Sequence, residues 1–249
     1  MRRLLKKLGF GYLKQIFKIF KNYLDYRKEY KIFKATNGQR FLVEDKDKYP
    51  LLNDKSKTTG FDKHYVYHTA WAARKLQEIS PKEHIDISSL LYFSTIVSAF
   101  IPIRFYDFRP AHIELDNLHC EHADVTALPF EDNSINSLSC MHVVEHIGLG
   151  RYGDPIDING DLKAISELKR VLSRKGSLLF VVPIGLPKIM FNAHRIYSYD
   201  QICSYFEEFE LMEYALIPDM SNEGLIINAT KEQSNLQHYG CGCFWFKKK

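Results

Sequence analysis

The sequence predicts an α/β fold of the doubly wound kind, with helices on both faces of a mainly parallel sheet. The apolar run at residues 178–182 has no polar alternation, as expected for a strand buried on both faces. Ahead of it, apolar residues recur at helical spacing from Leu162 to Leu172, which indicates a helix with one buried face. The short apolar run at residues 135–141 precedes that helix, so this part of the chain has the strand, helix, strand order of a parallel crossover.

Charge and composition divide the 249-residue chain into three parts. Residues 1–35 hold 11 Lys or Arg and two acidic residues, whereas the remainder holds 23 basic and 28 acidic residues. We therefore expect a basic amphipathic helix and connector at residues 1–58, an α/β domain at 59–235 and a short tail at 236–249. The five cysteines follow no disulfide or zinc-ribbon spacing, which favours a reducing cytoplasm. No apolar run approaches the roughly 18 residues that a membrane span needs.

Residues 3–34 predict a long amphipathic helix. Tyr12, Ile16, Ile19 and Tyr23 follow an apolar stripe, and lysines occupy another face. Two interpretations stay open: the helix lies on an anionic membrane at its inner face, or the stripe packs against its own domain or a partner subunit. A nucleic-acid contact is disfavoured because the body of the chain is acidic. The connector at residues 36–60 is expected to hold one short strand near residues 41–43.

The remaining elements follow from caps, turns and apolar runs. Asp62 is expected to cap a helix of about 17 residues that ends near Ser80. Strands are expected at residues 83–88, 102–107 and 113–115, with a helix at 90–100 after the first. Asp161 and Gly176 are expected to cap the start and the end of the helix before residue 178. Residues 211–217 and 225–230 predict a closing antiparallel pair.

Residues 124–183 carry a series of motifs in a fixed order. They are an acidic residue, Leu-Pro-Phe, an Asp-x-Ser turn, a strand, His-x-x-Glu-His, Glu-x-x-Arg-Val-Leu with a later glycine, and a strand that ends in proline, here Asp124, Leu128 to Phe130, Asp132 to Ser134, His142, Glu145, His146, Glu167, Arg170 to Leu172, Gly176 and Pro183. This series resembles the second half of the class I S-adenosylmethionine-dependent methyltransferases. Segments 148–157 and 191–198 resemble, more narrowly, a divergent subfamily known only as a domain of unknown function.

The resemblance covers roughly residues 60–230, the length of one ordinary domain. It implies a Rossmann-like sheet of seven strands, mostly parallel with a reversed last strand, and S-adenosylmethionine as the cofactor. In this family a glycine-rich turn follows the first strand, so that the backbone can approach the cofactor. This chain has Asp86 at the acidic position and Ser88 and Ser89 where glycines usually stand. We therefore expect a narrower binding turn, with loss of cofactor binding as the alternative.

Four further positions match cofactor contacts of the family. Asp107, at the end of the second strand, would accept hydrogen bonds from the two ribose hydroxyls, and the alternative is a turn-forming aspartate. Asp124 would accept from the adenine amino group while the backbone N–H of Val125 meets a ring nitrogen. The alternative is that Asp124 caps its own turn. His142 would line the methionine end of the pocket.

The catalytic candidates are His146, His194 and Asp154. His146 is expected at the carboxyl edge of the sheet, where a histidine can take a proton from a hydroxyl nucleophile near neutral pH. His194 is the second candidate base, and Asp154 could accept a hydrogen bond from a polyol or amine acceptor, although loop aspartates commonly form turns. A metal site at His142, Glu145 and His146 is disfavoured because the sequence offers no clear further ligand. A structural cluster that orders the turn is the other alternative.

The sequence therefore favours methyl transfer from S-adenosylmethionine to a hydroxyl or amine of a small polar acceptor, such as a sugar or a polysaccharide intermediate. The protein would align an in-line displacement in a dry pocket and supply one base. The alternative is a non-catalytic binding or scaffold protein that keeps the fold and has lost the cofactor. The glycine-free turn favours this alternative, whereas the retained Asp107, Asp124 and His-Glu-His cluster oppose it.

Overall fold

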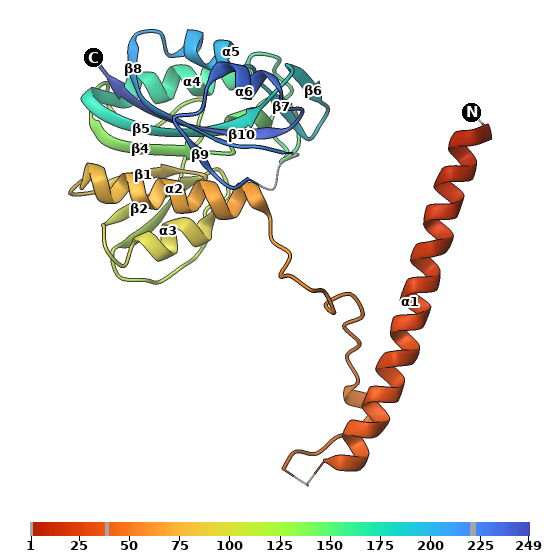
Figure 1. The fold of residues 1–249 in the computed structure, drawn as a ribbon. Helices are drawn as coiled ribbons and strands as arrows, with labels where there is room; N and C mark the ends of the chain where they lie inside the picture. The colour runs from red at the N-terminus through yellow and green to blue at the C-terminus, as the bar shows by residue number, and fades with distance from the viewer. Residues whose placement is uncertain (1, 38–39, 220–222) are drawn as a thin grey trace. The chain divides into compact units, whose positions relative to one another are not determined.

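The computed structural model describes residues 2–37, 40–219 and 223–249, with side chains from residue 14 onward. The chain forms two compact units, Met1–Gly60 and Phe61–Lys249, and each is described by itself. Figure 1 shows the helix of the first unit and the layered sheet of the second. Within the described residues, no helix combines the length and the apolar character that crossing a membrane requires.

The first unit consists of helix α1 (Arg2–Thr36) and a connector with one 3-10 turn, η1 (Asp45–Asp47). The connector folds back along α1, because Asn22 Nδ2 donates to the Leu52 carbonyl at 2.6 Å and the Tyr30 hydroxyl donates to Asp45 at 2.8 Å. The expected strand at residues 41–43 is absent from this unit, and the backbone there is irregular. The side chain of Tyr12, part of the predicted stripe, lies outside the described side chains.

The second unit is built on an eight-stranded sheet in the order β3-β2-β1-β4-β5-β10-β8-β9 (Figure 1). The strands are β1 (His84–Ile87), β2 (Ile103–Asp107), β3 (Leu118–His122), β4 (Ile135–Met141), β5 (Leu172–Ile184), β8 (Phe209–Ile217), β9 (Ile226–Ile227) and β10 (Gly240–Lys248). Strands β1 to β5 run parallel, and β10 runs antiparallel to both β5 and β8. This confirms the predicted doubly wound sheet with a reversed last strand, β10. The two-residue β9, antiparallel to β8, adds an eighth strand at the edge to the seven that were expected.

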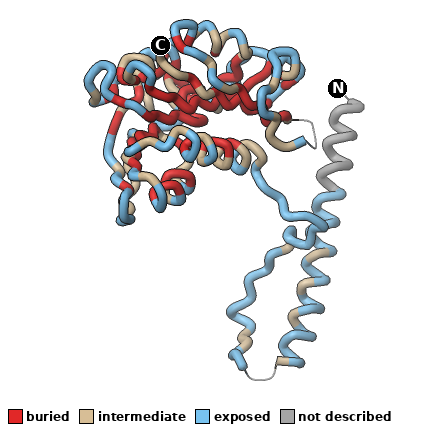
Figure 2. The backbone as a smooth tube through the Cα atoms, turned by 60° about the vertical axis from the view of Figure 1, so that its left-hand side comes forward, coloured by how far each residue is buried: buried red, intermediate tan, exposed pale blue. Residues whose placement is uncertain are grey.

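Helices cover both faces of the sheet (Figure 1). One face carries α2 (Lys63–Ile79) and α3 (Leu91–Val97), and the other carries α4 (Gly160–Val171), α5 (Tyr199–Tyr205) and α6 (Lys231–Asn235). Two apolar cores result, one around Trp71 and Phe93 and one around Leu168 and Phe206. Buried residues therefore follow the strands and the inner helix faces in Figure 2.

The helix α2 confirms the predicted cap. The Asp62 side chain accepts a hydrogen bond from the backbone N–H of Tyr65, and the helix ends where Ser80 adopts a left-handed backbone conformation. Its 17 residues place His68, Trp71 and Leu76 against the sheet. In the first turn, the His64 ring stacks on that of His142, the residue after β4, so this turn lies at the carboxyl end of the parallel strands.

The third strand lies further along the chain than predicted. Residues 113–115 contribute only a bridge at Leu115, and β3 begins at Leu118 after a turn in which Asn117 has φ +60°. The prediction was wrong because β3 is an edge strand. Only Leu118 of its five residues is buried, so the strand carries no apolar pattern that a sequence could show.

Both predicted caps of α4 were wrong. The helix begins after Asn159, and Asp161 is instead a buried residue whose Oδ2 accepts from the Tyr197 hydroxyl at 2.9 Å. The helix ends at Val171, where the chain passes directly into β5. Gly176 lies inside β5, where a Cβ atom would come within 2.8 Å of the Ser173 carbonyl oxygen. The glycine is therefore explained by close backbone approach rather than by a helix cap.

The segment expected as a tail forms the reversed strand. Residues 240–248 are β10, which pairs with β5 from Gly240 to Lys247 and with β8 from Cys241 to Lys248. The expected closing pair is reduced to two residues of β9 beside β8. The apolar run of β10 is only Cys243 to Phe246, which is too short to distinguish a strand from a packed tail.

Candidate functional site

A cavity of about 460 Å³ opens at the carboxyl ends of the parallel strands. We call it the first cavity. The residues that line it come from the ends of four strands and from the loop after β4: Ser88, Asp107, Asp124, Val125, His142, His146 and Asp154 are among them. Seven residues of the predicted cofactor and catalytic sets thus border one space.

The turn after β1 is built without glycine. Ser88 has φ +55°, a left-handed conformation that glycine adopts more readily. Its backbone N–H and its hydroxyl both donate to the Tyr106 carbonyl, at 2.7 and 3.1 Å, and the hydroxyl of Ser89 accepts from the backbone N–H of Met141 at 3.1 Å. The two serines therefore tie the turn to β2 and β4, while Ser88 still borders the first cavity.

Asp86 lies beneath this turn and is absent from the lining of the cavity that the described residues form. Its carboxylate accepts from the hydroxyls of Ser139, at 2.7 Å, and of Ser94. Burial raises the pKa of Asp86, against the effect of these hydrogen bonds. The structure therefore gives Asp86 a role in holding the turn, and any contact of Asp86 with a cofactor would be indirect.

Asp107 and Asp124 line the first cavity at the ends of β2 and β3. Asp107 Oδ1 accepts from the backbone N–H of Arg109 at 2.7 Å, and Asp124 Oδ1 accepts from the backbone and the hydroxyl of Thr126 at 2.8 and 2.7 Å. Both aspartates are thus turn formers. Within the described residues, these hydrogen bonds engage only Oδ1 of each carboxylate, so a turn role leaves an oxygen for a ligand.

A second cavity, of about 360 Å³, lies beside the first and shares His142 and His146 with it. Its lining is polar and aromatic: Asp62, His64, Tyr65, Glu145, Arg151, His194 and Tyr239 join the two shared histidines. His194 lines only this second cavity, where its ring lies 4.8 Å from the Tyr239 ring and 6.5 Å from the His146 ring, between centroids. Two predicted bases therefore border one space.

His142 is held in a fixed orientation between the two cavities. Its Nδ1 lies 2.8 Å from Glu145 Oε1, and its Nε2 lies 3.4 Å from Cys241 Sγ. Burial lowers the pKa of His142 to about 4 and raises the pKa of Glu145 to about 7. His142 is therefore neutral at pH 7. When Glu145 is ionised, Nδ1 carries its proton toward the carboxylate and Nε2 keeps its lone pair.

His146 has the protonation state that a general base requires. Its Nδ1 lies 2.6 Å from the Ala193 carbonyl oxygen, which also accepts from Arg151 at 3.0 Å. Arg151 Nη1 also lies 3.1 Å from Nδ1, but the carbonyl is closer to Nδ1 and can only accept. Nδ1 therefore carries the ring proton toward the carbonyl, and Nε2 is then unprotonated. Burial lowers the pKa of His146, so the neutral form dominates at pH 7. Nε2 lies 3.8 Å from Glu145 Oε1.

Asp154 borders the first cavity but is occupied by its own loop. Its Oδ2 accepts from the backbone N–H groups of Gly148 and Gly150 at 2.8 and 3.3 Å, and Oδ1 accepts from that of Tyr152 at 3.1 Å. Gly148 and Gly150 both have positive φ angles. Asp154 therefore orders the loop 148–157, which is the turn-forming alternative considered for it.

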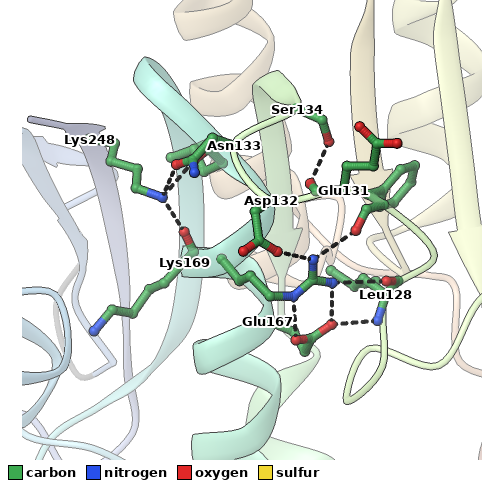
Figure 3. Close-up of polar contacts among 11 residues, drawn as sticks. Leu128, Glu131, Asp132, Asn133, Ser134, Glu167, Lys169 and Lys248 are labelled. Carbon is green, nitrogen blue, oxygen red and sulfur yellow. Dashed lines mark hydrogen bonds and ion pairs between the residues drawn. The ribbon is translucent and has the colours of Figure 1, made fainter.

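The glutamate and arginine of the Glu-x-x-Arg motif form hydrogen bonds to the loop that leads into β4 (Figure 3). Glu167 accepts from the backbone N–H of Leu128 at 2.8 Å and pairs with Arg170. Arg170 also donates to the Leu128 and Phe130 carbonyls and to Asp132. These motif residues therefore anchor the chain at Leu128 and Phe130, after the Asp124 turn, and neither of them lines a cavity.

Several lining residues were missed by the sequence-based prediction. Arg109 and Tyr152 border the first cavity with the guanidinium 4.7 Å from the ring centroid, and His64 and Tyr239 border the second. His64 lies in the first turn of the helix that Asp62 was predicted to cap, so its place in that helix could be predicted, but its place at the site could not. Tyr239 and its neighbour Cys241 precede or belong to β10, and no pattern placed that segment near the site.

The second half of the chain matches a family model. Residues 129–239 match the family described as "Caenorhabditis protein of unknown function, DUF268". A curated relative, the uncharacterized protein MJ0638 of Methanocaldococcus jannaschii, is 35% identical over 60 residues, which is 24% of this chain. The chain spans only 21% of the length of that relative.

Solved structures resemble most of the chain. The YcgJ protein of Bacillus subtilis is 13% identical, covers 74% of this chain and 99% of its own, and has a TM-score of 0.53. A putative sarcosine dimethylglycine methyltransferase of Galdieria sulphuraria is 12% identical over 74% and 86% of the two chains, with a TM-score of 0.52. The N-methyltransferase NodS of Bradyrhizobium japonicum, solved with S-adenosyl-L-homocysteine, is 11% identical over 75% and 89%, with a TM-score of 0.51.

Strand order, the reversed strand and these structural neighbours agree with the sequence-based resemblance. The matched family of unknown function fits the narrower resemblance of segments 148–157 and 191–198. Residues 61–249 have the fold of the class I S-adenosylmethionine-dependent methyltransferases, in a divergent form that matches a domain of unknown function.

Proposed function

We propose that this protein transfers a methyl group from S-adenosylmethionine to a hydroxyl or amine of a small polar acceptor. The observation that carries the proposal is the pair of adjoining cavities at the carboxyl edge of the sheet, which share His142 and His146. For an in-line displacement, the methyl group of the donor must lie next to the attacking atom of the acceptor. Two cavities that share lining residues can bind the two molecules side by side in this way. The distant structural neighbours support the fold on which the proposal rests.

The first cavity is assigned to the cofactor. Its volume of about 460 Å³ falls in the usual range of small-molecule sites. In this assignment Asp107 accepts from the ribose hydroxyls, Asp124 and the backbone of Val125 meet the adenine ring, and Ser88 borders the chain toward the methionine. His142 lies at the boundary with the second cavity and would mark the methyl end.

The second cavity is assigned to the acceptor. Its charged and aromatic lining, with Asp62, Glu145 and Arg151, suits a polar molecule such as a sugar or a polysaccharide intermediate. His146 borders both cavities with an unprotonated Nε2, so it is the base assigned to take the proton of the attacking hydroxyl or amine. His194 is the second candidate for that proton. Bond formation to the acceptor breaks the bond from the methyl to sulfur and releases S-adenosylhomocysteine.

Calorimetric titration with S-adenosylmethionine and S-adenosylhomocysteine tests the cofactor assignment. We expect Asp107→Ala to weaken binding by about 10- to 100-fold, because a charge-assisted hydrogen bond contributes about 1.5–3 kcal/mol. Asp116→Ala is the matched control, since Asp116 is an exposed carboxylate outside the cavity lining. Absence of binding to the wild-type chain at millimolar ligand would remove the proposal.

A non-catalytic scaffold is the second candidate, because Ser88 carries a side chain where the family has bare backbone. The same titration decides between them, since a scaffold that has lost the cofactor binds neither ligand.

The first unit is proposed as a docking element of a cytoplasmic enzyme. On α1, Phe17, Phe20 and Leu24 are exposed within the described residues. Such a basic, aromatic helix suits an anionic membrane surface or a partner protein. Sedimentation with vesicles that contain anionic lipid separates the two: binding that high salt weakens supports the membrane, and absence of binding leaves the partner protein.

A further inference from the structure

Three side chains of the kinds that bind metal ions lie close together at the second cavity. His64, His142 and Cys241 each offer one ring nitrogen or sulfur atom, and these three atoms lie within 4.8 Å of one another. They come from the first turn of α2, the residue after β4 and the second residue of β10. The protein therefore brings an imidazole, a second imidazole and a thiol together from three distant parts of the chain.

The distances approach those of a tetrahedral metal centre. Zinc bonds of about 2.3 Å to sulfur and about 2.0 Å to nitrogen place two such ligand atoms about 3.5 Å apart. Cys241 Sγ and His142 Nε2 are separated by 3.4 Å. The His64 and His142 ring centroids are 5.6 Å apart. Ligand atoms within 4.8 Å of one another need to close by no more than roughly 1.5 Å to reach that geometry.

Nδ1 of His142, the ring nitrogen that faces away from Cys241, has the carboxylate partner that metal-binding histidines usually have. Its Nδ1 is bonded to the buried carboxylate of Glu145 at 2.8 Å, so the proton is on that side and Nε2 presents its lone pair to Cys241. A carboxylate behind a histidine fixes the tautomer and the ring orientation of a metal ligand. The His64 ring packs against the Tyr239 ring, with 5.0 Å between the ring centroids.

Two buried polar atoms around the cluster have no hydrogen-bond partner within the described part of the chain. They are Oε2 of Glu145 and Nε2 of His68. His68 Nδ1 must donate to the His64 carbonyl, 2.7 Å away, so its Nε2 holds a bare lone pair. The His68 ring centroid is 5.1 Å from that of His142. Buried polar atoms normally have a hydrogen-bond partner, so unpaired lone pairs gathered at one place indicate a site for a bound cation.

We propose that His64, His142 and Cys241 bind a zinc-class transition metal ion. A thiolate with two imidazoles selects such an ion over magnesium or calcium, which prefer oxygen ligands. On binding, the Cys241 thiol gives its proton to the solvent. Because His64 and His142 line the second cavity, the fourth position of the ion is open on that side, as in catalytic zinc sites. The site shares His142 and the second cavity with the proposed methyl transfer, but neither proposal requires the other to be correct.

The test is metal binding to the purified full chain after removal of metal with a chelator. Zn²⁺ is titrated by calorimetry, and Co²⁺ is used as a spectroscopic probe whose sulfur-to-metal absorption reports thiolate coordination. We expect one equivalent of Zn²⁺ per chain and a loss of affinity of more than about 100-fold in Cys241→Ser, because a metal ligand is removed. The sulfur-to-metal band should disappear in the same variant.

Cys140→Ala is the matched control, since Cys140 is a buried thiol outside the cluster. His64→Gln is a second variant at a half-buried helix position, and it should weaken Zn²⁺ binding even if Cys241→Ser fails to fold. Circular dichroism verifies folding of each. Binding of less than about a fifth of an equivalent by the wild-type chain, or equal affinity of His64→Gln and Cys140→Ala, would overturn the proposal.

Discussion

Replacement of Arg170 by methionine should destabilise the α/β unit without touching either cavity. Arg170 makes two hydrogen bonds to the Glu167 carboxylate at 2.7 Å, one to Asp132 at 2.8 Å, and one each to the Leu128 and Phe130 carbonyls at 3.0 and 2.7 Å. The Arg170 side chain is 31% exposed, so water can replace only part of this network. Methionine keeps the apolar stem and removes every one of these donors.

The expected loss in free energy of unfolding is about 2–4 kcal/mol. Each lost carbonyl bond contributes about 1 kcal/mol, and the partly exposed ion pairs together contribute about 1–2 kcal/mol after allowance for solvent. For a unit of this size the midpoint temperature falls by about 2–4 °C per kcal/mol, so a decrease of roughly 5–15 °C is expected. Thermal and urea unfolding, followed by circular dichroism, measure both quantities.

Arg174→Met is the matched control, because Arg174 is exposed and makes no hydrogen bond or ion pair within the described residues. It should change stability by less than about 0.5 kcal/mol. Equal effects of the two substitutions would refute the view that the Glu-x-x-Arg motif holds the loop before β4. A cycle with Glu167→Gln then isolates the pair, and a coupling free energy near zero would refute the role of the ion pair alone.

Three further outcomes follow from single side chains. Burial lowers the pKa of His84 to about 3, so between about pH 6.5 and pH 3 the unfolded chain binds the extra proton and stability falls as pH falls. In urea titrations His84→Asn should therefore lose about 2 kcal/mol less than wild type between pH 7 and pH 5, and an unchanged pH dependence would contradict this. Gly148→Ala should lower the free energy of unfolding by more than about 2 kcal/mol, because the new Cβ atom would lie 2.0 Å from the Asp157 carbonyl oxygen. The control Gly153→Ala adds a Cβ atom in open space and should cost about 1 kcal/mol. Equal unfolding midpoints of the two variants would be inconsistent with the clash. Ser88→Leu should reduce S-adenosylmethionine affinity in calorimetry by at least about 100-fold while Ser88→Gly retains it, and tight binding to the leucine variant would show that the cofactor lies elsewhere.

The buried half of the sheet could be predicted from the sequence. Strands β1, β2 and β4 lie within a few residues of their predicted positions, and Asp62 caps α2 as expected. These elements carry a local physical signal, either an apolar run or a side chain that satisfies a helix end. The edge strand β3 carries almost none, because four of its five residues are at least partly exposed. The predicted strand therefore began five residues too early.

Part of the candidate site could also be predicted from the sequence, and part of it could not. Asp107 and His142 lie at the ends of β2 and β4, which the sequence identifies, so the topology brings them to one edge. Asp124 was found from its motif and not from β3, the strand before it. The metal-ligand cluster could not be predicted, since the sequence shows His142 without the partner that completes the set. Cys241 joins it only because β10 inserts between β5 and β8, and long-range pairing of that kind leaves no local pattern.

The central position of β10 has a consequence for how the unit can be handled. Strands β5 and β8 are neighbours of β10 and not of each other, so removal of residues from Gly240 onward would uncover a long open edge on each. Such a fragment would present unpaired amide and carbonyl groups along Leu178 and Tyr214, and it would be expected to self-associate rather than to persist as a smaller folded domain. Shortened forms of the chain would thus be expected to aggregate, so a loss of activity in them would not identify residues of the site.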